Sequence, residues 1–92
     1  AEMIDISEPE NKYYLSLNAK NKLGVIGKIG KIGEGNGISL ASIMQHGVRE
    51  NNTADIIVIT ELCKEKEMQK AISQFNDSEY INKVNSLIRV QI

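Results

Sequence analysis

One stretch decides the fold of this 92-residue chain: residues 13–39, which read YYLSLNAKNKLGVIGKIGKIGEGNGIS. Its first seven residues alternate between two faces, one of them apolar, and this period of two is typical of a strand. From residue 25 to residue 32, isoleucine and valine recur at the spacing of one helix face. Gly35-Asn36-Gly37 predicts the end of that helix, because glycine and asparagine tolerate the left-handed backbone found there.

The rest of the chain adds a hairpin, a second helix and a last strand. Residues 38–45 and 53–62 are rich in isoleucine and predict two antiparallel strands joined by the polar residues 46–52. Apolar residues at helical spacing predict a helix over 65–75, and residues 83–92 predict the last strand. The β-α-β-β-α-β order predicts an α+β, ferredoxin-like fold, with a four-stranded antiparallel sheet and both helices on one face.

Within this fold we expect defined faces and one boundary. The two helices should present apolar stripes made of Val25, Ile26, Ile29 and Ile32, and of Met68, Ala71, Ile72 and Phe75. The last strand should place Val84, Ser86, Ile88 and Val90 on one face, and Asn85, Leu87 and Arg89 on the other. Residues 1–11, which contain the single proline, are expected to form a linker or lead-in, and residues 12–92 the domain.

Composition and charge argue against several classes of function. The formal net charge is −1 and basic residues alternate with acidic ones, whereas a nucleic-acid-binding domain carries a clustered positive face. The single cysteine, Cys63, excludes an internal disulfide and a paired-cysteine zinc site, and it favours a cytoplasmic location. The apolar runs are too short to span a bilayer. We therefore expect a cytoplasmic domain that binds neither nucleic acid nor membrane.

The glycines do not form a nucleotide-binding motif. Six of them fall within residues 24–37. A dinucleotide fingerprint G-x-G-x-x-G could begin at residues 33–35, but Ile38 stands where the third glycine is required, and the P-loop spacing is also absent. We expect no cofactor in this chain. Gly27 and Gly30 are either tolerated weak helix formers or points where a second helix or subunit approaches closely.

The sequence does not predict catalysis or a metal site. His46 has no nucleophile near it in the sequence and is expected to be a solvated turn residue, while Cys63 is expected to be buried and inert. Arg49 and Arg89 are the only arginines, and neither lies in a glycine-rich turn. This argues against a small acyl- or phosphoryl-transfer enzyme of ferredoxin-like fold, such as an acylphosphatase. We expect no catalytic residue, no metal ligand and no enzyme activity in this chain alone.

One turn points to a binding site. The segment Asn21-Lys22-Leu23-Gly24 precedes the first helix, so unpaired amides at the helix N-terminus, together with the helix dipole, can attract a carboxylate. Asn21 can both donate and accept hydrogen bonds, and Gly24, which lacks a Cβ, lets a ligand approach the backbone. A plain turn without a ligand is the alternative interpretation of the same residues.

At these residues the chain resembles the ACT domain family. The family's signature is a strand, the turn Asp-x-Pro-Gly-Val, a helix, and then Gly-x-Asn-Gly-Ile-Ser. The corresponding segments here read NKLGV at residues 21–25 and EGNGIS at residues 34–39. Leu23 stands where proline is usual, which makes the turn less rigid. Asn21 replaces the frequent aspartate and removes a charge that would repel a carboxylate.

Three further segments are similar to the C-terminal ACT domains of homoserine dehydrogenases: YYLSL at 13–17, IMQ at 43–45 and NSLIRV at 85–90. This resemblance implies a non-catalytic allosteric domain that binds a small amino acid, usually threonine, and mediates dimerisation. The parent enzyme would be an NAD(P)-dependent oxidoreductase of threonine and methionine biosynthesis. Its cofactor and its catalytic residues would lie in a part that this chain does not contain.

The resemblance also implies an effector site shared between two copies. The effector-binding residues would be Asn21, Leu23, Gly24, Val25 and Ile26 from the turn of one copy, with Ser39 and Ala41 from the partner's second strand. The copies would pair edge to edge or through helices, as a homodimer or a higher oligomer, and would contact the catalytic domain of the parent. Two alternatives stay open: an ACT domain that only dimerises, and the ACT domain of another amino-acid-biosynthetic enzyme.

Overall fold

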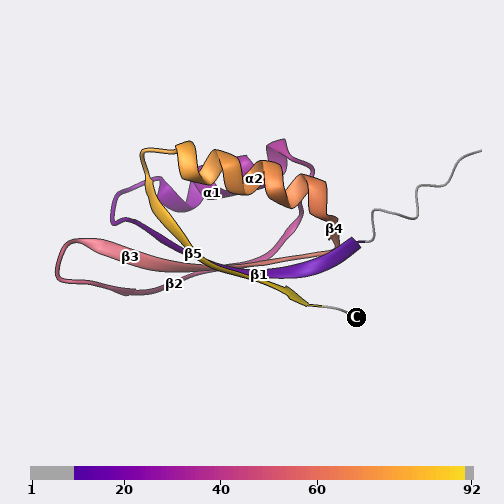
Figure 1. Ribbon diagram of the computed structural model, residues 1–92. Helices are drawn as coiled ribbons and strands as arrows, with labels where there is room; N and C mark the ends of the chain where they lie inside the picture. Colours follow the sequence, from indigo (N-terminus) through magenta and orange to yellow (C-terminus); the bar gives the residue numbers. More distant parts are fainter. Residues whose placement is uncertain (1–9, 91–92) are drawn as a thin grey trace, which may run out of the picture.

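The computed structural model describes residues 10–90 and shows an antiparallel sheet with both helices packed on one face (Figure 1). The elements in chain order are β1 (Glu10–Lys20), α1 (Val25–Gly35), β2 (Leu40–Val48), β3 (Thr53–Thr60), β4 (Cys63–Lys64), α2 (Glu65–Asp77) and β5 (Ile81–Val90). The four long strands lie in the order β2-β3-β1-β5. The predicted α+β, ferredoxin-like arrangement is confirmed.

The core lies between the helices and the covered face of the sheet. Alternate residues of β1 are at most 1% exposed and pack with buried residues of both helices: Tyr13, Leu15, Leu17, Ala19, Val25, Ile29, Ile32, Met68, Ala71 and Phe75. Ile26 is exposed and Ile72 only partly buried, because both fall at the margin of their helix stripes. The other residues of β1, including Tyr14, lie on the side without helices, which we call the open face.

The sheet has one short strand more than the sequence predicts. Cys63 and Lys64 of β4 pair with Asn11 and Glu10 of β1, on the same side of β1 that β3 occupies further along. β1 therefore begins at Glu10 and includes the last two residues that were expected in the lead-in. The rest of that lead-in, residues 1–9, lies outside the described residues.

The connection between β2 and β3 is shorter than the predicted polar link of residues 46–52. β2 continues through His46 to Val48, and its pairing register shifts after Gln45. Gly47 lies in this irregularity with φ +86°, a left-handed conformation that glycine adopts without a Cβ penalty. The strand can therefore bulge and continue. The prediction that His46 is a turn residue is wrong, since it is an exposed residue of the strand.

A bulge overturns the predicted alternation of β5. The pairing of β5 with β1 skips one residue at Asn85. Val84 and Leu87 consequently both pack against the core, although strict alternation puts them on opposite faces. Ile88 then lies opposite Tyr14 on the open face. The prediction failed because one inserted residue inverts every assignment that follows it.

A polar contact fixes α2 to the sheet at its first residue. Glu65 Oε1 accepts hydrogen bonds from the Tyr13 hydroxyl (2.7 Å) and from Arg89 Nη2 (2.8 Å), while Gln69 donates to Glu65 Oε2 (2.6 Å). The bond from Tyr13, followed by that from Gln69, lowers the pKa of Glu65 below its ordinary value. The start of α2 is thereby joined to β1 and β5.

Candidate functional site

The turn between β1 and α1, residues 21–24, is held by two neighbouring loops. Asn21 N donates to Asn52 O (3.1 Å), and Asn21 Nδ2 donates to Asn52 Oδ1 (3.3 Å). Just before the turn, Lys20 N donates to Tyr80 O (2.9 Å). The turn is therefore tied to the β2–β3 hairpin on one side and to the α2–β5 loop on the other.

The N-terminus of α1 leaves backbone amides open at this turn. The residue before the helix, Gly24, has φ +86° and supplies no side-chain cap, and Val25 N makes only a long bond of 3.4 Å to Lys22 O. The amides of Ile26 and Gly27 also lack a helix carbonyl four positions back, as first-turn amides do. The first turn of α1 contains no acidic residue. These amides and the helix dipole together favour an anion at the turn.

A pocket of about 230 Å³ lies at the turn, lined by residues 20–27 together with Gln45 and Ala54. It brings together five of the seven predicted effector residues: Asn21, Leu23, Gly24, Val25 and Ile26. Leu23 is 98% exposed, so its side chain is left uncovered by the described part of this chain. The volume is below that of most sites for drug-sized ligands, which fits a small ligand.

The two other predicted effector residues lie away from this pocket. Ser39 lines a separate hollow of about 530 Å³ next to Gly30, Glu34 and Gly37 of the α1–β2 region. Ala41 is exposed where the register of β2 shifts. Both were expected to reach the site from a second copy, and that expectation stays a prediction.

The chain that carries this site is similar in sequence and in structure to known proteins. No protein-family model matches the chain. It is 27% identical, over 97% of its length, to a homoserine dehydrogenase of Neisseria gonorrhoeae, and 24% identical, over 95%, to one of Corynebacterium glutamicum. A solved homoserine dehydrogenase from Thiobacillus denitrificans matches 89% of the chain with a TM-score of 0.76 and 29% identity. The chain is homologous to the C-terminal region of homoserine dehydrogenases.

This ACT-like chain corresponds to only a small part of each relative. It spans about a fifth of the length of the homoserine dehydrogenases that it matches, with 20% of the Neisseria protein and 18% of the Thiobacillus chain covered. The C-terminal domain of the MgtC protein from Mycobacterium tuberculosis has a TM-score of 0.69 at 13% identity, a likeness of fold alone. The resemblance that the sequence motifs predict is confirmed at the level of this region.

Gln45 of the ACT-like domain lines the turn pocket, and the sequence did not predict it there. It lies two residues after Ile43, which packs against the core, and it pairs with the buried Ile56 of β3. By alternation, its amide is therefore on the covered side of the sheet. The sequence does contain a sign of this position, because Gln45 is polar although it falls on the strand face that otherwise carries apolar residues. The signal becomes specific only once the fold places β2 near the start of α1.

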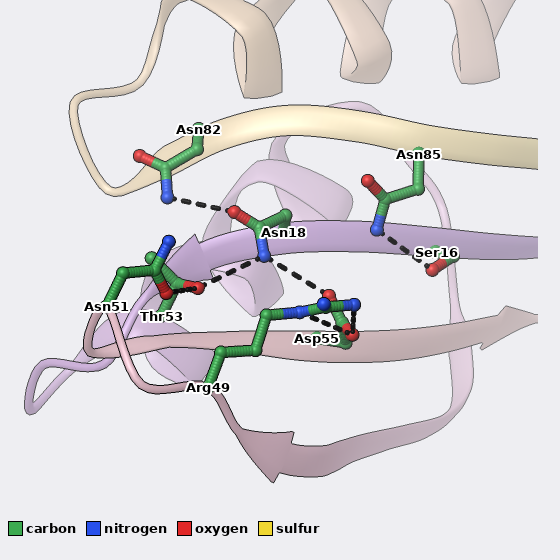
Figure 2. Close-up of polar contacts among 8 residues, drawn as sticks. All are labelled: Ser16, Asn18, Arg49, Asn51, Thr53, Asp55, Asn82 and Asn85. Atoms are coloured by element: carbon green, nitrogen blue, oxygen red, sulfur yellow. Dashed lines mark hydrogen bonds and ion pairs between the residues drawn. The ribbon is translucent and has the colours of Figure 1, made fainter.

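A second polar feature of this domain, which we call the polar cluster, consists of Asn18, Arg49, Asp55 and Asn82 on the open face. Figure 2 shows Asn18 Nδ2 donating to Asp55 Oδ1 (3.2 Å), Asn82 Nδ2 donating to Asn18 Oδ1 (3.0 Å), and Arg49 Nη2 donating to Asp55 Oδ2 (2.6 Å). The bond from Arg49 is the main cause that lowers the pKa of Asp55. Because these side chains satisfy one another, the cluster is a structural network on the open face.

The cysteine of the ACT-like domain is buried, and its two arginines are held in ion pairs. Burial raises the pKa of the Cys63 thiol, which disfavours the nucleophilic thiolate. Arg49 and Arg89 are paired with Asp55 and Glu65. Within residues 10–90, His, Cys, Asp and Glu side chains form no group of three that could hold a metal ion. None of the helices described for these residues is long and apolar enough to cross a membrane.

Proposed function

We propose that this chain is a non-catalytic allosteric domain that binds a small amino acid, with threonine the first candidate, at the β1–α1 turn. The observation that carries the proposal is the turn pocket, where first-turn amides lie open in a region homologous to the C-terminal part of homoserine dehydrogenases. The parent protein would be a homoserine dehydrogenase of threonine and methionine biosynthesis in the cytoplasm. Its NAD(P) cofactor and its catalytic residues would belong to the other four fifths of that protein.

The groups around the pocket suit both ends of an amino acid. A carboxylate would accept hydrogen bonds from the amides of Ile26 and Gly27, where the helix dipole contributes about 0.3–1 kcal/mol, or up to about 2 kcal/mol when partly buried. The ammonium group would donate to Asn21 Oδ1, because the oxygen is the acceptor of this side chain, while Asn21 Nδ2 donates to Asn52. The side-chain amide of Gln45 would contact the rest of the ligand.

The exposed rim of the pocket supports a site shared with a second copy. Leu23 is almost fully exposed there, and a partner segment that contains Ser39 and Ala41, at the start of β2, would cover it together with the ligand. The domain would then work as a homodimer or a higher oligomer. Ligand binding at such an interface would change the relative position of the two copies, which is how the catalytic domain of the parent would sense the amino acid.

Dimerisation without a ligand is a second candidate function, and the exposure of Leu23 favours it. A partner copy can bury this apolar side chain whether or not an amino acid is bound. Under either function the chain alone should have no dehydrogenase activity and should bind no nicotinamide cofactor. A fluorescence titration with NADPH tests this, and saturable binding would contradict it.

Calorimetric titration with threonine distinguishes the two functions when wild type is compared with Gly24→Asp and Gly47→Asp. Both glycines have φ +86°, and a Cβ added at either would meet no atom within 4 Å, so the two substitutions carry similar backbone strain. Only Gly24→Asp places a carboxylate at the pocket. We expect Gly24→Asp to abolish threonine binding, and Gly47→Asp to bind as wild type does.

Circular dichroism of both variants shows whether they are folded. If a folded Gly24→Asp variant binds threonine as well as wild type, the site lies elsewhere. If wild type binds no amino acid at millimolar concentration, dimerisation without a ligand replaces the proposal, and Leu23 in place of the family's proline becomes the first position to revert.

A further inference from the structure

We infer that a hollow on the open face binds a small anion that carries hydroxyl groups, such as a phosphate ester or a hydroxy acid. The hollow has a volume of about 520 Å³, within the range of small-molecule sites. It is lined by the four residues of the polar cluster together with Asn51, Lys83 and Asn85, and we call it the amide hollow. It shares no residue with the turn pocket, so this second site goes beyond the proposed function.

Two bulges in β5 bring asparagine side chains to this hollow. The pairing of β5 with β1 skips one residue at Asn82 and again at Asn85. Asn82 Nδ2 donates to Asn18 Oδ1 (3.0 Å), and Asn85 Nδ2 donates to Ser16 Oγ (3.3 Å), so both skipped residues contact the open face of β1 (Figure 2). Bulges re-aim side chains and are frequent next to active sites. Here they gather the polar residues of β5 at one place on the open face.

The polar cluster holds one side of the amide hollow in a fixed geometry. Asp55 Oδ2 accepts hydrogen bonds from both Arg49 Nε (3.2 Å) and Arg49 Nη2 (2.6 Å), while Asp55 Oδ1 accepts from Asn18 Nδ2 (3.2 Å). These bonds orient the guanidinium and leave its third nitrogen, Nη1, outside the ion pair. Groups that are already held in place lose little freedom when a ligand binds, so the network favours binding.

The amide hollow offers three donors to an anion. Lys83 stands opposite Asn18 in the pairing register, and Asn51 is oriented by the hydrogen bond that its Oδ1 accepts from Thr53 Oγ1 (2.7 Å). Within residues 10–90, no hydrogen bond or ion pair engages Lys83 Nζ, Asn51 Nδ2 or Arg49 Nη1. A phosphate or carboxylate group in the hollow would accept from these atoms, and bonds from the two charged donors are the stronger ones.

The asparagines of the two bulges offer acceptors instead. Because Asn82 Nδ2 and Asn85 Nδ2 are engaged with β1, the atoms that these side chains leave for a ligand are their Oδ1 atoms. An amide oxygen accepts a hydrogen bond from a hydroxyl group but repels the oxygens of an anion. A ligand that satisfies both the donors and the acceptors of the hollow is therefore an anion with hydroxyl groups.

The charges of the amide hollow also favour an anion. Its lining contains two cations, Arg49 and Lys83, and one anion, Asp55, so one positive charge is in excess. Two more charged residues lie close by in the chain, Lys20 after the end of the hollow in β1 and Glu50 beside Arg49, and their opposite charges leave this excess unchanged. A concave site with an excess of one sign attracts ligands of the other sign.

NMR titration of the isotope-labelled chain tests the inference. The side-chain amides of Asn51, Asn82 and Asn85 report on the amide hollow, and the backbone amides of Ile26 and Gly27 report on the turn pocket. Glycerol 3-phosphate, glycerate, inorganic phosphate and glycerol are each added to about 20 mM at constant ionic strength, so that charge screening is the same throughout. We expect glycerol 3-phosphate or glycerate to shift the asparagine signals saturably, inorganic phosphate to bind more weakly, and glycerol not to bind. The tighter of the two hydroxylated anions identifies phosphate or carboxylate as the anionic group.

Two variants of the hollow and one matched control locate the binding. Lys83→Gln removes a cationic donor, and Asn51→Asp replaces an amide donor by a charged oxygen while it keeps the acceptor for Thr53. Lys31→Gln is the control, because Lys31 is exposed on α1 and each of the three substitutions lowers the net charge by one. We expect the dissociation constant of the tighter probe to rise about tenfold or more in both hollow variants and to stay that of wild type in the control.

The spectrum of each free variant shows whether it is folded, and if one hollow variant is unfolded the other decides the test. No saturable shift of the asparagine signals with either hydroxylated anion overturns the inference. Inorganic phosphate that binds as tightly as they do also overturns it, because the hydroxyl groups would then have no role. Equal weakening by Lys31→Gln overturns it as well, because overall charge would explain the loss. Shifts confined to Ile26 and Gly27 overturn this inference and leave the proposed turn site in place.

Discussion

The two helices of this domain begin in opposite ways. α2 begins at Glu65, whose carboxylate binds Tyr13 and Arg89, and the Glu67 side chain accepts a hydrogen bond from the backbone just before the helix (3.0 Å). α1 begins after Gly24 with neither a side-chain cap nor an acidic residue in its first turn. The start of α2 holds the helix on the sheet, whereas the start of α1 leaves its amides open. The polar contacts that fix a helix start to the sheet and the proposed binding site therefore lie at different helices.

The largest effect should come from the core, where the two helices ought to behave alike. Ile29 of α1 and Met68 of α2 are 0% and 1% exposed, so Ile29→Ala and Met68→Ala should each lower the free energy of unfolding by about 2–5 kcal/mol. Urea denaturation followed by circular dichroism measures both. If Ile29→Ala is already unfolded without urea, Ile29→Val replaces it. Its expected loss in the free energy of unfolding is about 0.5–1.5 kcal/mol, which remains measurable. A loss for Met68→Ala alone would contradict equal packing of the two helices at these positions.

Glu65→Ala should produce the next largest effect, because it removes the contact that distinguishes the start of α2. The Tyr13 hydroxyl and Arg89 would lose their shared acceptor, and we expect a loss of about 1–2 kcal/mol in the free energy of unfolding. Glu79→Ala is the control, since Glu79 is exposed in the α2–β5 loop and its substitution should change stability by less than about 0.5 kcal/mol. Equal losses in the free energy of unfolding of the two variants would show that the contacts of Glu65 do not fix α2 to the sheet.

The pH dependence of stability should sharpen the same contrast. Hydrogen bonds from Tyr13 and then Gln69 lower the pKa of Glu65 in the folded chain. The stabilisation is therefore present above the unfolded-state pKa, near 4.5, and is lost as the pH falls through the lower folded-state pKa. Between about pH 5 and pH 3, the free energy of unfolding of wild type should fall more steeply than that of Glu65→Gln. Asp55 titrates in both proteins, so parallel curves would contradict the assignment to Glu65.

The smallest effect should be a gain in stability within α1. A Cβ at Gly30 would meet no atom within 4 Å, so Gly30→Ala should stabilise the domain by up to about 1 kcal/mol in thermal unfolding. At Gly33 the added Cβ would touch Leu40 at 3.4 Å, so Gly33→Ala should gain less. Sedimentation of Gly30→Ala separates the two interpretations of the helix glycines. Unchanged association means tolerated weak helix formers, and lost association means close approach of a second subunit.

The sequence predicts the elements of this fold well where the evidence is local. The alternation of residues 13–19, the helical spacing after Gly24 and the stop at Gly35-Asn36-Gly37 all correspond to structural features within the same few residues. Prediction fails where one residue is inserted into a pairing. The bulge at Asn85 and the irregularity at Gly47 depend on how a neighbouring strand matches each position, and a period of two counted along one strand does not contain that information.

The candidate site likewise has a part that the sequence predicts and a part that depends on strand pairing. The turn residues that line the pocket are consecutive, so their shared position could be predicted from the turn itself. Gln45 reaches the same pocket from β2, and its place there depends on the register with β3. The polar cluster joins Asn18, Asp55 and Asn82 across three strands, and sequence spacing alone does not bring such residues together.

The burial of Cys63 gives this domain a built-in reporter of local opening. The thiol is 1% exposed, and β4, in which it lies, pairs with the first residues of β1. A thiol reagent reaches it only in molecules in which the structure around Cys63 has opened, so the labelling rate under native conditions, compared with that of the unfolded chain, gives the free energy of that opening. Without any substitution, the rate of one chemical reaction thus measures how often the part of the core around Cys63 opens to solvent.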